Sequence, residues 1–255
     1  MMFETSFREK VALVTGGTGG IGSEIVRRLA QHGANIAICY SSQTSKADAL
    51  AREIEKCGVI AHTLKIDQRD ESSIRSAIDN CERKFGRLDI VVNNAAWNKG
   101  IPFSETQAMT SELWDKMMEI NLRGPFLIAR EAAELLRRDG GGHIVNISSN
   151  GGIAPTSSSI AYSVSKAGLL HLTRCLAVAL APDIAVNAIA PGVVSGTRMA
   201  DRMPNDVRDS ETKSSVLGRN ATAKDIALQL VCICQSRSIS GQTIAIDGGM
   251  PIAMR

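Results

Sequence analysis

Short apolar runs alternate along the chain with longer segments in which apolar residues recur at helical spacing. The short runs predict strands at residues 10–15, 35–40, 60–66, 88–93, 142–148, 184–190 and 242–247. The longer segments predict helices at residues 21–32, 44–57, 70–85, 105–138 with a break near Asn121, 160–180 and 222–235. This alternation predicts an α/β fold, a doubly wound parallel sheet of about seven strands with helices on both faces. Ligands of such folds bind at the carboxyl ends of the strands.

Composition is typical of a globular protein, with 44% hydrophobic and 22% charged residues among 255. We expect residues 1–255 to form a single domain, because α/β domains of this length are common. A net charge of +3 without a Lys/Arg cluster argues against nucleic acid as a partner. No apolar run approaches the ~18–20 residues of a membrane span, and residues 1–9 do not resemble a signal peptide, so no membrane attachment is expected.

The six cysteines are scattered over predicted strands and helices rather than grouped at ligand spacing. Free thiols in a reducing compartment are a better interpretation than disulfides, so we expect a cytoplasmic protein. The four histidines form no ligand pattern, and no metal site is predicted.

A glycine-rich turn joins the first predicted strand to the first predicted helix. Its glycines follow the spacing Gly16-x-x-x-Gly20-x-Gly22, which differs from the common Gly-x-Gly-x-x-Gly pattern. Glycine permits the tight turn and lets backbone N–H groups approach a pyrophosphate at the positive end of the helix. We interpret the segment as a phosphate-binding loop, and an ordinary glycine-rich turn is the alternative.

Tyr162 and Lys166 lie four residues apart in a predicted helix and therefore share one face. A free tyrosine titrates near pH ~10 and a free lysine near ~10.4, so neither alone is an effective acid or base at neutral pH. An ammonium held close to the phenol would lower the tyrosine pKa, and about three units of lowering require roughly 4 kcal/mol. We therefore expect Tyr162 to exchange a proton near neutral pH. A solvated helix face is the alternative for this pair alone.

Further motifs follow one another in a fixed order along the chain. They are Asn93-Asn94-Ala95-Ala96, Asn121, Ser149 thirteen positions before Tyr162, Pro191-Gly192, and the segment from Ile239 to Gly249. Together with the glycine turn and Tyr162-x-x-x-Lys166, they make the chain resemble the short-chain dehydrogenase/reductase family from about Lys10 to Met250. The general pattern is nearest to the 3-oxoacyl-thioester (acyl-carrier-protein) reductases. The resemblance implies a Rossmann fold and hydride transfer between a nicotinamide cofactor and a carbonyl compound or secondary alcohol.

The resemblance also implies roles for individual residues. Tyr162 would protonate the forming alkoxide, and Lys166 would lower the phenol pKa and hold the nicotinamide ribose. Ser149 would bind the carbonyl oxygen, and Asn121 would break its helix to hold a water that relays protons to Lys166. Contacts with the cofactor are implied at Gly16, Thr18, Gly20, Ile21, Gly22, Tyr40, Ser41, Ser42, Asp67, Gln68, Asn94, Tyr162, Lys166, Pro191, Val194 and Thr197. Simpler interpretations are a serine-containing turn for Ser149, and a cap between helices for Asn121.

Cofactor choice depends on the end of the second predicted strand, where a carboxylate would bind the adenosine ribose of NAD. The chain has Tyr40-Ser41-Ser42 there, and Lys46 follows, so NADP(H) is favoured and NAD(H) is the alternative. Asp67 resembles the family residue that contacts adenine, and a helix cap is its alternative role. Ala96 replaces the family's usual glycine, and the segment from Pro191 to Thr197 is one residue longer than the common form.

The segment from Thr197 to Leu217 is expected to form a short flap over the active site. The first substrate hypothesis is a 3-oxoacyl thioester or related ketone. The alternative is an alcohol or sugar dehydrogenase that works in the oxidative direction. A non-enzymatic cofactor-binding protein is disfavoured, because Ser149, Tyr162 and Lys166 are all present.

The helices predicted at 105–138 and 160–180 carry more apolar residues than one face packed on a sheet requires. An extra apolar face usually marks an interface, and family members commonly pair these two helices with their symmetry mates. We therefore expect a homotetramer or a dimer. Burial of the surplus by the loop from Asn150 to Ser159 within one chain is the alternative.

Overall fold

A seven-stranded parallel sheet runs through the centre of the protein, whose computed structural model describes residues 7–201 and 203–253. Its strands are β1 (Val11–Val14), β2 (Asn35–Tyr40), β3 (Ala61–Lys65), β4 (Ile90–Asn93), β5 (Gly142–Ile147), β6 (Ile184–Pro191) and β9 (Thr243–Ile246). They lie in the order β3-β2-β1-β4-β5-β6-β9, with every pair parallel. The predicted doubly wound sheet is confirmed, and all seven predicted strands are present.

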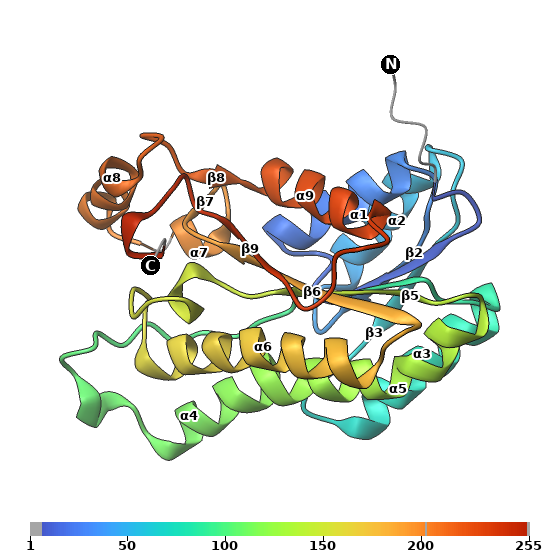
Figure 1. Ribbon diagram of the computed structural model, residues 1–255, viewed down its shortest axis with the longest axis horizontal. Helices are drawn as coiled ribbons and strands as arrows, with labels where there is room; N and C mark the ends of the chain where they lie inside the picture. The colour runs from blue at the N-terminus through green and yellow to red at the C-terminus, as the bar shows by residue number, and fades with distance from the viewer. Residues whose placement is uncertain (1–6, 202, 254–255) are drawn as a thin grey trace.

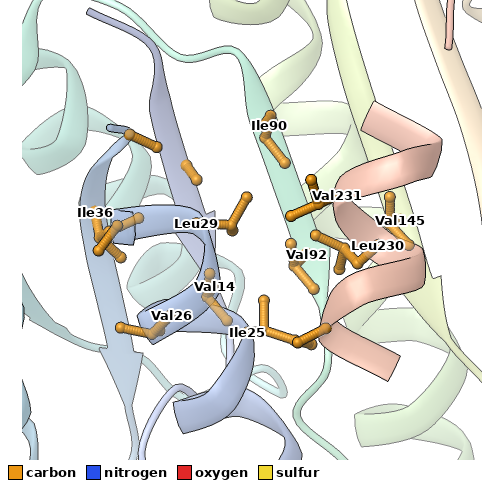
Figure 2. Packing of buried hydrophobic residues seen from close by; sticks show 14 of the residues in the cluster. Val14, Ile25, Val26, Leu29, Ile36, Ile90, Val92, Val145, Leu230 and Val231 are labelled. Atoms are coloured by element: carbon orange, nitrogen blue, oxygen red, sulfur yellow. The ribbon is translucent and has the colours of Figure 1, made fainter. Parts of the chain in front are cut away.

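Helices cover both faces of the sheet (Figure 1). One face carries α1 (Gly20–Gln31), α2 (Thr44–Glu55) and α9 (Ala223–Gln235), and the other carries α3 (Glu71–Phe85), α5 (Gly124–Arg138) and α6 (Ile160–Ala179). Figure 2 shows how α1 and α9 direct side chains such as Leu29 and Leu230 onto the strands. Because both faces are covered, β1 and β4 are buried along their whole length, which explains the apolar sequence of β1 and of β4 up to Asn93.

Local signals in the sequence fix the ends of several helices. The Asp70 carboxylate accepts a hydrogen bond from the Ser72 N–H at the start of α3, and Gly86 ends the helix at a φ of 74°. Asp70 therefore has the capping role that was the alternative for Asp67. At α9, Thr222 and Asp225 form a reciprocal capping box.

The prediction of a long helix at 105–138 is wrong about where the helix starts, and the helical segment is divided in the middle. A 3₁₀ turn (Thr106–Ala108) comes first, and α4 (Ser111–Met118) begins only where the Thr110 hydroxyl accepts from the Leu113 N–H. A π-turn (Glu119–Arg123) then separates α4 from α5. The break expected near Asn121 is confirmed, and π-turns of this kind often occur at functional sites.

The chain after β5 adds short elements beyond the sheet. They are η3 (Asn150–Gly152), β7 (Val194–Ser195), α7 (Arg198–Asp201), α8 (Asn205–Ser214), β8 (Ala221–Thr222) and η4 (Pro251–Ala253). In Figure 1, α7 and α8 lie at the end of the molecule that also holds the first turn of α6. The predicted flap segment thus contains two short helices. Residues 1–6, within the segment analysed for a signal peptide, lie outside the described residues.

Candidate active site

The glycine turn between β1 and α1 has the geometry of an anion-binding loop. Gly16 has a φ of 61°, and a Cβ there would lie 2.9 Å from the Cα of Ala95. A Cβ on Gly22 would lie 2.2 Å from the carbonyl oxygen of Gly16, so neither position admits a side chain. Helix α1 begins after Gly19 with no side-chain cap and no acidic residue in its first turn. Its first N–H groups and its positive dipole end are therefore available to a phosphate.

Asn94 holds this turn in place from the neighbouring strand. Its Nδ2 group donates to the carbonyl oxygens of Thr15, at 2.9 Å, and Gly16, at 3.1 Å. The Thr15 hydroxyl in turn accepts from the main-chain N–H groups of Asn94 and Ala95, each at 3.0 Å. The amide of Asn94, predicted to contact the cofactor, is thus directed at the loop. The Asn93 Nδ2 donates a hydrogen bond to the Asn146 Oδ1 at 2.8 Å, which links β4 to β5.

Tyr162 and Lys166 lie in the first two turns of α6, which the Ser159 hydroxyl caps by accepting from the Tyr162 N–H. Both side chains are almost completely buried, with 6% and 2% exposed. The Lys166 Nζ lies 5.6 Å from the centroid of the Tyr162 ring and donates to the Ile147 carbonyl at 2.8 Å. An ammonium carries three donor hydrogens, and Ile147 is the one hydrogen-bond acceptor for Lys166 within the described residues.

Burial dominates the protonation of this pair. It raises the pKa of Tyr162 to about 12 and lowers the pKa of Lys166 to about 8. The expectation that Lys166 lowers the pKa of Tyr162 is therefore wrong for this structure, because desolvation of the buried phenol is the cause of the shift and it raises the pKa. At pH 7 the phenol is protonated and the lysine is charged.

Ser149 lies two residues after the end of β5 and caps the 3₁₀ turn η3. Its hydroxyl accepts from the Gly151 N–H at 3.1 Å and donates to the Asn150 side-chain oxygen at 3.4 Å. The Gly151 carbonyl accepts a hydrogen bond from the Ser163 hydroxyl, next to Tyr162. The loop that carries Ser149 is thus fastened to the helix that carries Tyr162 and Lys166.

Asn121 is fully buried in the π-turn and joins three segments. Its Oδ1 accepts from the Trp97 N–H at 2.8 Å, and its Nδ2 donates to the Trp97 carbonyl at 2.9 Å and to the Ser165 hydroxyl at 3.1 Å. This is more than a cap between helices. The side chain connects the β4–α4 loop to α6 one turn from Tyr162.

The residues predicted for the adenosine end lie at the carboxyl ends of β2 and β3. Tyr40 is partly buried at the last position of β2, and Ser41 and Ser42 are exposed just beyond it. The Asp67 carboxylate accepts from the Arg69 Nε at 3.1 Å and from its Nη2 at 2.7 Å, and the Arg69 hydrogen bonds lower the pKa of Asp67.

A hollow of about 460 Å³ lies beside this end, lined by Ser41, Lys65, Ile66, Asp67, Arg69, Ser73, Lys116 and Ile120. Gln68, by contrast, turns inward, and its amide nitrogen donates to the Ile120 carbonyl at 3.0 Å.

The residues predicted for the nicotinamide end come from β6, β7 and the start of the flap. Pro191 ends β6, and Val194 starts the short strand β7. The Thr197 hydroxyl donates to the Val194 carbonyl at 2.8 Å and accepts from the Ala200 N–H, so it caps α7. A Cβ on Gly20 would lie 3.1 Å from the Thr197 methyl group, which places the flap against the glycine turn. In that turn Thr18 and Ile21 are half-buried.

Sequence reasoning missed an apolar cluster beside Tyr162. Met117, Ala161 and Tyr162 form its buried part, and Trp97, Met109 and Trp114 pack against them. Both tryptophans of the chain are in this cluster. The position of Trp97, directly after the Asn-Asn-Ala-Ala motif, was a signal that could have placed it at the site. Within the described part of the chain, no group of three or more His, Cys, Asp or Glu residues could hold a metal ion, and no helix could span a membrane.

Comparison with known proteins gives the family. The family model described as Enoyl-(Acyl carrier protein) reductase matches residues 16–251. This chain belongs to the short-chain dehydrogenase/reductase family. It is therefore an oxidoreductase that acts on CH–OH or carbonyl groups. Two relatives illustrate the range of proteins to which the chain is similar. Tropinone reductase-like 3 of Erythroxylum coca is 36% identical over 98% of this chain and 96% of its own length. The 3-oxoacyl-(acyl-carrier-protein) reductase of Aquifex aeolicus is 33% identical over 97% and 99%.

Solved structures of the family superimpose closely on this chain. A short-chain dehydrogenase from Burkholderia cenocepacia J2315 in complex with NADP has a TM-score of 0.89 at 32% identity, covering 96% of this chain and 99% of that one. An NAD⁺-bound xylitol dehydrogenase has a TM-score of 0.90 at 27% identity, covering 95% and 99%. Relatives of this fold therefore include proteins bound to either nicotinamide cofactor.

Proposed function

We propose that this short-chain dehydrogenase/reductase transfers a hydride between NADP(H) and a carbonyl or secondary alcohol, and that it reduces a 3-oxoacyl thioester or related ketone. The observation that supports this best is the buried pair of Tyr162 and Lys166 beside the end of β5. Burial raises the pKa of Tyr162 to about 12, so the phenol carries its proton at pH 7, and the nearby Lys166 charge is needed to stabilise the phenolate once that proton is given up.

The residues fit a dinucleotide at this edge of the sheet. The uncapped start of α1 offers backbone N–H groups to a pyrophosphate. The Lys166 ammonium has two donor hydrogens beyond the one given to Ile147, which suits the two hydroxyls of a ribose. The bound nicotinamide supplies or accepts the hydride.

Each catalytic residue then has a defined task. Tyr162 donates its proton to the substrate oxygen, and Ser149 turns its hydroxyl from Asn150 to the same oxygen. The positive charge of Lys166 stabilises the phenolate left behind. The Asn121 amide is occupied by Trp97 and Ser165, so we propose that a proton-relaying water bonds the main chain of the π-turn, where the α-helical ladder is interrupted.

The preference for NADP(H) is supported by the end of β2. Ser41 and Ser42 are exposed there without a neighbouring carboxylate in the sequence, and Lys46 is exposed in the first turn of α2. These groups suit a 2′-phosphate. NAD(H) is the alternative, since a related xylitol dehydrogenase has been solved with NAD⁺.

A substrate panel tests the proposed reaction. The purified protein is assayed with NADPH and an acetoacetyl thioester, and separately with NADP⁺ or NAD⁺ and a set of alcohols and sugars. Faster turnover of the thioester with NADPH supports the proposal. Turnover confined to polyols with NAD⁺ would contradict it and favour the alcohol or sugar dehydrogenase, which the xylitol dehydrogenase relative represents. The same assay with NADH gives the cofactor preference as a ratio of kcat/KM values.

We also propose a homotetramer, with α5 and α6 pairing between copies. Much of the apolar surplus on α6 is buried within the chain, including Leu169 and Leu176. Phe126 and Val164 nevertheless remain 41% and 40% exposed, and a hollow of about 580 Å³ lies along α4, the π-turn, α5 and α6. Light scattering at micromolar concentration tests this, and a mass near the 27.2 kDa of one chain would contradict it.

The whole chain is proposed to act as a single domain in the cytoplasm. The six cysteines of the described residues are all free, which suits a reducing compartment.

A further inference from the structure

The segment after β3 is fastened to the π-turn by three separate contacts. The Gln68 Nε2 donates to the Ile120 carbonyl at 3.0 Å, and the Arg123 Nη2 donates to the Arg69 carbonyl at 3.2 Å. Gly124, which follows the π-turn, packs against Gln68 so closely that a Cβ would lie 2.9 Å from the Gln68 Cβ. The segment that carries Asp67, at the proposed adenine end, therefore cannot shift without moving the π-turn.

The other side of the π-turn is fastened to the catalytic helix. The Asn121 Nδ2 donates to the Ser165 hydroxyl at 3.1 Å, and that hydroxyl donates to the Tyr162 carbonyl at 2.8 Å. Hydrogen bonds, joined by the main chain between Ile120 and Asn121, thus lead from Gln68 through the π-turn to Tyr162. Discrete, packed contacts of this kind are how energetic coupling is carried between sites.

If the Gln68 side chain served only to fill space in the interior, glutamine would be an unfavourable residue at this position. It is 5% exposed, and its side-chain oxygen is buried without a hydrogen-bond partner among the described residues. A buried unpaired carbonyl is destabilising, whereas an apolar side chain of the same length would carry no such penalty. The side chain is therefore explained by its other end, the amide nitrogen that bonds the Ile120 carbonyl.

We infer that Gln68 is a positioning residue that couples occupancy of the adenine end of the cofactor site to the alignment of Tyr162 and Lys166. The adenine half of the cofactor lies at the opposite end of the site from the carbon that carries the hydride. Its binding is therefore expected to raise kcat through the Gln68 connection, in addition to raising the affinity for the cofactor. The inference rests on the proposed function, because it assigns the adenine half of the cofactor to the segment after β3.

Gln68→Met is the test variant, since methionine keeps the length of the side chain and removes the donor. Arg123→Gln is a second variant that cuts the other hydrogen bond between the same two segments. Arg130→Gln is the control: it breaks an ion pair between α5 and Glu71 of α3 and leaves the π-turn contacts intact. All three variants leave Asp67, Tyr162 and Lys166 unchanged.

Kinetics compare NADPH with reduced nicotinamide mononucleotide, which lacks the adenine half. Gln68→Met is expected to lower kcat with NADPH about tenfold, the effect of one buried hydrogen bond expressed in the transition state, with KM changed less than about threefold. With the mononucleotide, kcat stays at the parent value. An equal fall with both cofactors would show a merely structural role, and a rise in KM alone would show simple binding; either result would overturn the inference.

Hydrogen exchange gives a second readout that needs no turnover. Adenosine 2′,5′-bisphosphate and 5′-AMP serve as probes of the adenine end. In the parent and in Arg130→Gln, either bound probe is expected to slow exchange at residues 67–70 and at the π-turn, residues 119–123. In Gln68→Met, protection is expected at 67–70 only. Unprotected residues 119–123 in the parent, or failure of both probes to bind, would overturn the inference.

A parent protein without NADPH-dependent activity would refute the proposed function separately, and the exchange data would still decide the coupling.

Discussion

Replacing Lys166 with methionine tests whether a charged amine is buried beside the active-site phenol. Methionine has a similar length and no charge, so the substitution removes the ammonium and its hydrogen bond to the Ile147 carbonyl. Activity is expected to be lost, because the phenolate of Tyr162 loses its stabilising charge. The free energy of unfolding gives the more discriminating result.

The size of the effect follows from the pKa of Lys166, which burial lowers from 10.5 to about 8. At pH 7 the buried ammonium therefore destabilises the fold by roughly 3 kcal/mol relative to a neutral amine. Between pH 8 and 10.5 the unfolded chain binds more protons at this lysine than the folded chain does, so stability rises with pH. From pH 7 to pH 9.5 about 2 kcal/mol of the penalty disappears. In Lys166→Met the unpaired Ile147 carbonyl costs about 1–3 kcal/mol at either pH.

Urea unfolding of the parent and of Lys166→Met at pH 7 and pH 9.5 measures this difference. The stability of the parent relative to the variant is expected to increase by about 2 kcal/mol between the two pH values, with other titrating groups cancelling in the comparison. A relative stability that stays constant would refute the reasoning, because it would mean that the Lys166 amine is not desolvated.

Three further predictions concern the cofactor preference, the stability at acidic pH and the π-turn. Ser41→Asp is expected to shift the ratio of kcat/KM from NADPH toward NADH, because a carboxylate there repels a 2′-phosphate and binds a ribose hydroxyl; an unchanged ratio would remove Ser41 from the site. Burial lowers the pKa of His143, so stability is expected to fall as pH drops below about 6.5, and urea unfolding should show a shallower fall for His143→Gln. Asn121→Ala, which removes three hydrogen bonds at a fully buried position, is expected to lower the free energy of unfolding by about 2–4 kcal/mol, and a loss below about 1 kcal/mol would contradict the role assigned to that side chain.

The sequence was sufficient for the sheet, because strands covered on both faces leave unbroken apolar runs. β1 is the clearest example, and the boundaries of β1 and β4 lie within one or two residues of the prediction. The segment at 105–138 was harder, since helical spacing continues through residues that do not form a helix. Its start depends on the Thr110 cap, and the π-turn depends on contacts made by Asn121 with segments far away in the sequence.

Motifs located the candidate site, but its electrostatics came from the fold. The separation of four residues correctly predicted that Tyr162 and Lys166 lie on one face of a helix. The spacing could not show how deeply both would be buried, and burial reversed the expected direction of the Tyr162 pKa. Likewise, the sequence placed Gln68 among cofactor contacts, whereas its inward direction depends on the space left by Gly124.

The central claim, that Tyr162 is the proton donor in NADPH-dependent carbonyl reduction, is tested most directly with Tyr162→Phe. Steady-state turnover of an acetoacetyl thioester is measured together with NADPH affinity, which quenching of Trp97 and Trp114 emission near the site can report. We predict that kcat falls by at least about a thousandfold, within the range for loss of a general acid, while the NADPH Kd changes less than about threefold. Turnover within about tenfold of the parent would contradict the account, because another group would then have to supply the proton.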